Sequence, residues 1–138
     1  MDRCDLSFDP ARFQFDRIHA LLSHSYWTPG LGRERVERAF AHSLAIGAFH
    51  GTEQVGCARL VTDRTSFGYL ADVMVHEAHR SRGLGRAMTR ALLDHPEVRT
   101  LRRILLVTRD AHGLYAACGF EPLEDPAAFM QIHRPFQG

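Results

Sequence analysis

The sequence predicts a mixed α/β fold of the α+β class, in which an antiparallel meander and a β-α-β crossover share one sheet. Three apolar runs separated by short turns predict the meander, at residues 45–50, 54–61 and 67–75. A helical pattern from residue 84 to about 95 and a further apolar run at 104–108 come next. Because a strand-helix-strand connection is right-handed and joins parallel strands, the last run should lie parallel to residues 69–75.

Length and composition fit one domain, and we expect it to span residues 1–138 because no repeat, low-complexity segment or linker interrupts the pattern. The hydrophobic content of 45% and charged content of 24% are typical of globular proteins. A formal net charge of +1 gives no general affinity for nucleic acid or membrane, so we expect neither partner. Any anionic ligand must then be bound locally.

The cysteines indicate a reducing compartment. Cys4, Cys57 and Cys118 are odd in number, far apart and in no Cys-x-x-Cys pairing. Reduced thiols in a cytoplasmic protein are the simplest account. We find no stretch that resembles a signal peptide or a membrane span.

The N-terminal part predicts a short strand and two helices. Residues 6–8 can form the strand, which Asp9 and Pro10 end, and a first helix runs from Phe15 to about Ser25. The second helix follows the loop at residues 26–32, with four apolar residues on its inner face: Val36, Ala39, Phe40 and Leu44.

The C-terminal part predicts one short helix and two short strands. Asp110 can cap a helix over residues 111–118, and Gly119 suits the position after its end. Residues 120–123 and 130–133 are predicted as strands joined by a proline-containing loop.

The turn between residue 75 and the long helix has the features of an anion site. Gly83 and Gly85 let a ligand approach the backbone closely at a helix N-terminus, where four N–H donors lack intrahelical partners. Arg80, Arg82 and Arg86 add positive charge at the same place. A pyrophosphate is the anion that this arrangement fits best, although solvated arginines around an ordinary strand-to-helix turn would give the same residues.

The form Arg80-x-x-Gly83-x-Gly85 is neither the G-x-G-x-x-G dinucleotide fingerprint nor a Walker A loop. It resembles the R/Q-x-x-G-x-G/A signature of the GCN5-related N-acetyltransferase superfamily, called GNAT. A second pattern, Leu114-Tyr115-x-x-x-Gly119-Phe120, follows in the order that this superfamily shows. The resemblance covers essentially the whole chain. It implies the GNAT fold and an acetyl-CoA-dependent N-acetyltransferase that modifies a primary amine of a small molecule or peptide by direct attack.

The resemblance also implies how the chain would hold acetyl-CoA. The pyrophosphate would lie on the backbone amides of residues 82–86, and the pantetheine arm would pair with the preceding strand near Val73 and Val75. The arm enters where two parallel strands splay apart next to a bulge, and the oxyanion falls near the N–H groups of Met74 and Val75. The expected donor-binding residues are Val73, Met74, Val75, Arg80, Ser81, Arg82, Gly83, Leu84, Gly85, Arg86, Ala87, Asp110 and Leu114.

Two residues are candidates for catalysis. Tyr115 lies at the position of the superfamily's general acid, and its phenol can protonate the departing thiolate, although it could also serve only in packing. Asp72 shares a strand face with Leu70 and Met74 and could anchor the substrate ammonium or act as a water-mediated base. An ion pair with one of the arginines would explain this carboxylate equally well. His76 is a second candidate base.

The acceptor site is expected near Tyr26 and Trp27. The two helices that flank this aromatic loop resemble the region that forms one wall of the acceptor site in the superfamily, although loop aromatics also serve as packing anchors. C-terminal edge strands often pair in the superfamily, so the resemblance is also compatible with a homodimer. No metal is predicted, because the spacing of His76-Glu77-Ala78-His79 does not match a zinc motif.

A second function comes from a different class. A non-catalytic acyl-CoA-binding sensor or regulatory module would need the glycine turn but not the acid Tyr115. A nucleotide-binding protein is a more distant alternative, which an affinity for ATP or NAD above that for coenzyme A would favour.

Overall fold

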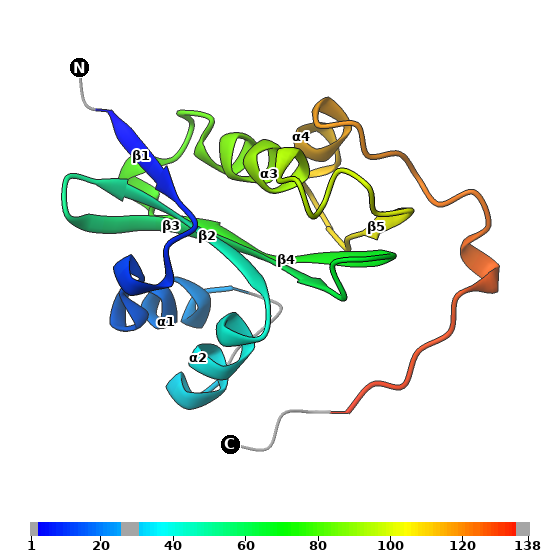
Figure 1. Ribbon diagram of the computed structural model, residues 1–138, viewed down its shortest axis with the longest axis horizontal. Helices are drawn as coiled ribbons and strands as arrows, with labels where there is room; N and C mark the ends of the chain where they lie inside the picture. The colour runs from blue at the N-terminus through cyan, green and yellow to red at the C-terminus, as the bar shows by residue number, and fades with distance from the viewer. Residues whose placement is uncertain (1–2, 26–30, 135–138) are drawn as a thin grey trace.

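The computed structural model describes residues 3–25 and 31–134, and its centre is one mixed sheet of five strands (Figure 1). The strands lie in sequence order: β1 Cys4–Ser7, β2 Leu44–His50, β3 Glu53–Thr62, β4 Phe67–Val75 and β5 Arg103–Leu105. The first four pair antiparallel, and β5 pairs parallel with β4. The predicted combination of a meander and a crossover is confirmed.

Helices cover both faces of the sheet. In Figure 1, α1 and α2 lie on one face and α3 and α4 on the other. Their bounds are Phe15–Ser23 for α1, Arg33–Ala41 for α2, Leu84–Asp94 for α3 and His112–Ala117 for α4. In the described part of the chain, none of the helices has the length and apolar character needed to cross a membrane.

Each face of the sheet has its own apolar core. The core on the α3 face includes Ile46, Leu60, Met88 and Leu92, all of which are almost fully buried. The core on the α1 and α2 face includes Ile18, Leu22, Val36 and Phe40. The helical spacing of these residues in the sequence is what allows each helix to bury one face.

A β-bulge interrupts β4. Cys57 pairs with Met74 and Arg59 with Ala71, so Asp72 and the residue after it together oppose a single residue of β3. Asp72 has a positive φ of 56°, which is the left-handed conformation found at such bulges. The extra residue reverses the alternation of side chains along the strand. Leu70 therefore packs in the α3-side core while Met74 packs in the other, and the prediction that Leu70, Asp72 and Met74 share a face is wrong.

The parallel pairing of β4 and β5 is short. It joins Phe67 with Arg103, Gly68 with Ile104 and Tyr69 with Leu105, and it ends before the bulge. The strand predicted over residues 104–108 is thus only three residues long and starts one residue earlier. Beyond Tyr69, the edge of β4 that faces β5 has no neighbouring strand among the described residues.

The predicted C-terminal strands at residues 120–123 and 130–133 do not form in the described chain. Residues 121–134 are exposed and contain only a short 3₁₀ turn, Pro126–Ala128, and Figure 1 shows this segment leaving the body of the molecule. A strand needs a partner for its backbone hydrogen bonds, and this segment pairs with no strand among the described residues. Pro122 and Pro126 also lack the N–H that a ladder requires.

Two smaller predictions at element ends also fail. Leu44 starts β2 instead of extending the second helix, because α2 already ends at Ala41. Asp110 does not cap α4, whose N-cap is Ala111 without a side-chain bond. Thr108 Oγ1 accepts the Ala111 N–H instead, at 3.1 Å.

Candidate functional site

The start of α3 is open to solvent, as an anion site requires. Gly83 is the N-cap with a φ of +77°, and a Cβ added there would meet no heavy atom within 4 Å. The carbonyl of Gly83 accepts the Ala87 N–H at 2.9 Å, which is the first hydrogen bond of the helix. The three N–H groups before Ala87 precede that bond and have no intrahelical acceptor. Residues 81–83 are exposed, so the helix start is accessible.

Three elements that carry predicted donor-binding residues meet at Gly85. A Cβ built on Gly85 would lie 3.7 Å from Leu114 Cδ1 and 3.8 Å from Val73 Cγ1. The first turn of α3, the second half of β4 and the helix α4 therefore border one space. The sequence placed these residues in one site, and the structure brings these three together.

The free edge of β4 presents backbone groups of Val75. The His76 N–H donates to the Val55 carbonyl at 2.7 Å, so it points toward β3. Because backbone groups alternate along a strand, the N–H and C=O of Val75 point to the free edge and those of Met74 point to β3. The Val75 carbonyl indeed accepts Nε of Arg80 at 3.0 Å. Val75 is therefore better placed than Met74 to offer an N–H to a ligand along this edge.

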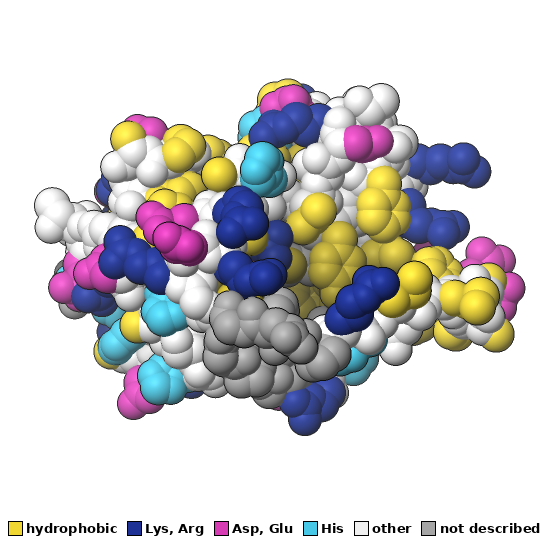
Figure 2. Space-filling model, turned by 90° about the horizontal axis from the view of Figure 1, so that it is seen from below, with side chains coloured by type: hydrophobic (Ala, Val, Ile, Leu, Met, Phe, Trp, Pro, Cys, Tyr) yellow, Lys and Arg dark blue, Asp and Glu magenta, His cyan; other side chains and the backbone are white. Residues whose placement is uncertain are grey.

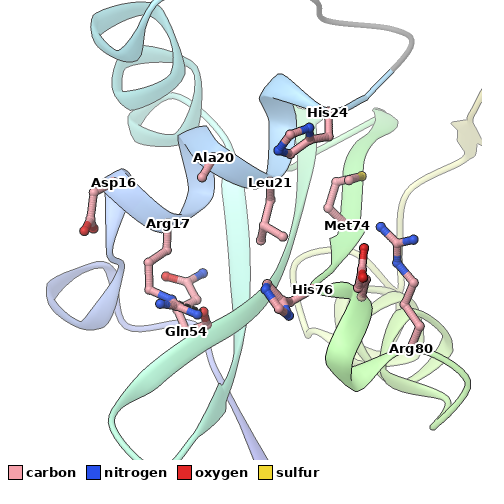
Figure 3. A pocket seen from close by; sticks show the side chains of 10 residues that line it. Asp16, Arg17, Ala20, Leu21, His24, Gln54, Met74, His76 and Arg80 are labelled. Atoms are coloured by element: carbon pink, nitrogen blue, oxygen red, sulfur yellow. Dashed lines mark hydrogen bonds between the residues drawn. The ribbon is translucent and has the colours of Figure 1, made fainter.

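Arg80 is exposed, but its side chain is held at the end of β4 and does not lie beside the glycine turn. Its Nε bond to the Val75 carbonyl holds the side chain against the end of β4. Figure 3 shows the guanidinium turned toward Met74, on the side of α1. Arg82 and Arg86 are exposed at the helix start, where the sequence predicted all three arginines.

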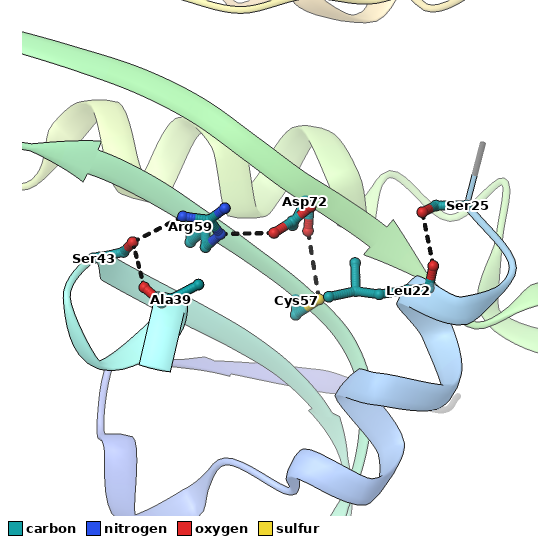
Figure 4. A network of polar contacts seen from close by, with 7 residues as sticks. All are labelled: Leu22, Ser25, Ala39, Ser43, Cys57, Arg59 and Asp72. Carbon is teal, nitrogen blue, oxygen red and sulfur yellow. Dashed lines mark hydrogen bonds and ion pairs between the residues drawn. The ribbon is translucent and has the colours of Figure 1, made fainter. Parts of the chain in front are cut away.

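Asp72 and Tyr115 lie toward opposite faces of the sheet. Tyr115 is half-buried on α4, packs against the α3-side core and makes an edge contact with Phe120 at 6.0 Å between ring centroids. Asp72 is 6% exposed and its carboxylate accepts Nε of Arg59 at 2.6 Å (Figure 4). The ion pair that the sequence left open as an alternative is thus present.

The Asp72–Arg59 pair belongs to a larger polar network on the α1 and α2 face (Figure 4). Nη1 of Arg59 donates to Ser43 Oγ at 3.1 Å, and Ser43 Oγ donates to the Ala39 carbonyl at 2.7 Å. The Cys57 thiol donates to the Asp72 carbonyl at 3.4 Å. Burial and the nearby Asp72 carboxylate raise the pKa of Cys57 far above its usual range, so this thiol is not a nucleophile at neutral pH.

A cavity of about 690 Å³ lies between α1 and the end of β4 (Figure 3). Its lining includes Leu21 and His24 of α1, Gln54 of β3, and Met74 and His76 at the end of β4. The remaining lining residues are Asp16, Arg17, Ala20, Glu77 and Arg80. The volume is in the range of small-molecule sites. The cavity reaches β4 past the bulge, next to the backbone edge described above.

Three histidines gather at the entrance to the glycine turn. The ring of His79 lies 5.1 Å from that of His50 and 6.3 Å from that of His76. Burial, the facing His50 and the nearby Arg82 and His76 lower the pKa of His79 below 6.5. His76 Nδ1 accepts the Ala78 N–H at 3.2 Å, which places a proton on Nε2 when the ring is neutral. Within residues 3–25 and 31–134, no three His, Cys, Asp or Glu side chains are arranged to hold a metal ion.

Sequence reasoning missed two parts of this region. Arg59 could have been found, because it is the one charged residue in the otherwise apolar run of residues 55–61. The contribution of Arg17 and Gln54 to the cavity left no signal in the sequence, since an arginine on a helix and a glutamine at the start of a strand are common in any protein. The predicted acceptor contacts Tyr26 and Trp27 lie outside the described residues.

Comparison with known proteins identifies a single family. The model of the Acetyltransferase (GNAT) family matches residues 12–120. A Gibberella zeae protein named as an acetyltransferase is 34% identical, and the match covers 80% of this chain and 74% of that protein. Glucosamine 6-phosphate N-acetyltransferase 1 of Oryza sativa subsp. japonica is 30% identical over 72% of this chain and 70% of its own. A crystal structure of a Xanthomonas campestris pv. campestris protein of the GNAT family superimposes with a TM-score of 0.93, at 39% identity over 98% of this chain and 96% of that one.

Proposed function

The chain belongs to the acetyltransferase (GNAT) family and is an acetyltransferase, and from that premise we propose that it moves the acetyl group of acetyl-CoA to a primary amine. The acceptor is a small molecule or a peptide, and its amine attacks the thioester directly. Tyr115 acts as the general acid for the departing thiolate.

The observation that carries this proposal is the exposed start of α3. An anion can reach the first N–H groups of the helix because Gly83 has no side chain and its surroundings are empty. Arg82 and Arg86 add charge beside these donors, and the helix dipole favours an anion at this end. These residues fit the diphosphate of coenzyme A, with Ser81, Leu84 and Ala87 completing the turn. Val73, Gly85 and Leu114 border the space through which the pantetheine would run.

Each chemical requirement of amine acetylation has a candidate in this chain. The Val75 N–H at the free edge of β4 can stabilise the oxyanion of the tetrahedral intermediate. The Tyr115 hydroxyl can donate its proton to sulfur. Asp72 is better suited to hold Arg59 and the bulge in position than to act as a free base, because its carboxylate already accepts the guanidinium. The proton of the ammonium then leaves through water or His76.

The acceptor would approach β4 from the cavity between α1 and the strand end. This cavity lies on the α1 and α2 face, and it reaches Met74, next to the edge where the acetyl group is expected. The rice relative is named for an amino-sugar phosphate, a molecule of a size that such a cavity accepts. We therefore include glucosamine 6-phosphate among the acceptors to be tested.

Turnover separates this proposal from a non-catalytic acyl-CoA sensor. The protein is incubated with acetyl-CoA and a panel of amines, including sugars, polyamines, amino acids and peptides, and free thiol is followed with time. Release of coenzyme A that depends on one class of amine supports the enzyme. Tight binding of acetyl-CoA without amine-dependent release on any member of the panel would favour the sensor.

We also propose that the protein forms a homodimer through residues 121–134. This segment carries exposed apolar side chains, including Met130 at 97% and Ile132 at 81% exposure, and Figure 2 shows hydrophobic side chains gathered along it at the right. Their spacing of two is that of one strand face, and a second copy could supply the missing strand partner. Light scattering should give the mass of two chains, and of one chain in a Met130→Asp, Ile132→Asp variant.

A further inference from the structure

The cavity between α1 and the end of β4 contains charges of both signs, and they are held differently. Arg17 donates from Nε to the Gln54 carbonyl at 2.6 Å, and its Nη2 lies 3.1 Å from Glu53 Oε1. Arg80 donates from Nε to the Val75 carbonyl at 3.0 Å. Each guanidinium is thus fixed to a backbone carbonyl through Nε. The carboxylates of Asp16 and Glu77 are on exposed residues, and within the described chain neither joins an ion pair.

Fixing a guanidinium through Nε leaves its terminal nitrogens for a ligand. Among the described residues, the terminal nitrogens of Arg80 have no partner, and Figure 3 shows them on the side of the cavity where Met74 lies. One terminal nitrogen of Arg17 also remains after the contact with Glu53. A pre-positioned guanidinium loses less side-chain entropy when it binds a planar or tetrahedral oxyanion. The two arginines therefore form a prepared site for an acidic group.

The same charges suit the amine that must react nearby. An incoming ammonium can be attracted by Asp16 or Glu77 at the cavity entrance. Close to Arg80, a positive neighbour disfavours the ammonium form, so the reactive neutral amine becomes more populated. Among the described residues, an acceptor bearing only an amine would leave the terminal nitrogens of Arg80 without a partner of opposite charge.

We propose that the acceptor is a dipolar molecule, an amine that also carries a carboxylate or phosphate bound by Arg17 and Arg80. This inference rests on the proposed acetyltransfer and specifies its substrate class. A carboxylate and a phosphate both present an oxyanion to the arginines, and the experiment below distinguishes between them.

Paired acceptors test the proposal. Glucosamine 6-phosphate is compared with glucosamine to probe a phosphate, and methionine with methioninamide to probe a carboxylate. We expect kcat/KM for the acidic member of one pair to exceed that of its neutral partner at least tenfold. Arg17→Gln should reduce this ratio at least fivefold and leave the KM for acetyl-CoA within twofold. The matched control Arg38→Gln removes an exposed arginine of α2 outside the cavity and should leave the ratio unchanged.

A second variant tests the cavity without removing the contacts that Arg17 makes. Ala20→Trp fills the cavity from an exposed position of α1 without changing charge, and Ala41→Trp makes the same change on α2, away from the cavity. We expect Ala20→Trp alone to raise the KM of the acidic acceptor tenfold or more. A loss of acetyl-CoA affinity in Ala20→Trp, with acceptor KM unchanged, would assign the cavity to the donor and overturn the proposal.

Failure of this proposal can be told apart from failure of acetyltransfer. Ratios near one in both pairs, with turnover present, overturn the dipolar acceptor and leave the enzyme standing. If no amine is acetylated, the proposed function fails, and calorimetry decides the inference with the same four compounds on the protein saturated with coenzyme A. Preferential binding of an acidic member that Arg17→Gln removes still supports it, whereas equal or absent binding within both pairs overturns it.

Discussion

The two halves of β4 differ in the number of strands beside them. Phe67, Gly68 and Tyr69 pair with β5, and this half also pairs with β3, whereas Met74 and Val75 pair only with β3 in the part of the chain that the structure describes. The first half is closely packed: a Cβ on Gly68 would lie 3.1 Å from Leu60. The second half has a free backbone edge and leads into the glycine turn. The bulge at Asp72 is the boundary between them.

This difference shows how one strand can serve two purposes. Backbone groups that pair with a neighbouring strand stabilise the sheet, and the same groups are available to a ligand where the neighbour ends. The bulge achieves the change within one residue, because it bends the strand and reverses which face each side chain occupies. Changes in the second half and its loop should therefore affect ligands, and changes in the first half should affect mainly the fold.

The largest effect is expected at the helix start. Gly83→Glu or Gly85→Glu places a carboxylate where the diphosphate should bind, and we expect acetyl-CoA affinity to fall by about 10³-fold or more through repulsion and lost access to the N–H groups. Calorimetry measures the affinity. Gly51→Glu is the matched control for Gly83→Glu, because Gly51 also has a positive φ, of 62°, and open surroundings but lies in the turn between β2 and β3. Unchanged affinity in Gly83→Glu and Gly85→Glu would show that the glycine turn does not bind the donor.

The next effect is expected at Tyr115. Tyr115→Phe removes the proton donor and should lower kcat about 10²-fold, the usual contribution of general acid catalysis, with little change in acetyl-CoA affinity. Tyr69→Phe makes the same change in the doubly paired half of β4. Steady-state kinetics give kcat for both variants, and Tyr69→Phe should leave kcat unchanged. A fully active Tyr115→Phe enzyme would exclude this residue as the general acid.

A smaller effect should follow from breaking the ion pair at the bulge. Asp72→Asn leaves Arg59 without its carboxylate in a site where the arginine side chain is only 19% exposed. We expect a loss of about 2 kcal/mol of unfolding free energy, somewhat less than for a fully buried pair. Urea unfolding measures it, and the double variant Asp72→Asn, Arg59→Gln should lose less than the sum of the single changes. Additive losses would mean that the pair does not act as a unit.

The sequence predicted the parts of the molecule that local patterns encode. The helical spacing of Leu84, Met88 and Leu92 and the position of Gly83 before them were sufficient to predict α3 and its exposed start. The bulge at Asp72 was not located, because an apolar run pairs equally well with or without an extra residue. The strands predicted in the C-terminal segment were wrong, because strand formation depends on a partner strand that the residues of the segment do not specify.

The smallest expected effect is a pH dependence at the ligand-binding end. Burial and the facing His50, Arg82 and His76 lower the pKa of His79 below 6.5 and outweigh the opposite influence of Glu53. When the pH falls below about 6.5, His79 therefore binds a proton more readily in the unfolded chain than in the folded one. The stability that neutral His79 contributes is present above that pH and is lost as the pH falls. The urea midpoint should fall between pH 7 and 5, and His79→Phe should flatten this slope while keeping the ring beside His50. His42→Phe, an exposed change at the residue that follows α2, should leave the slope as it is. If the urea midpoint of His79→Phe falls as steeply with pH, the pH dependence of stability does not arise from His79.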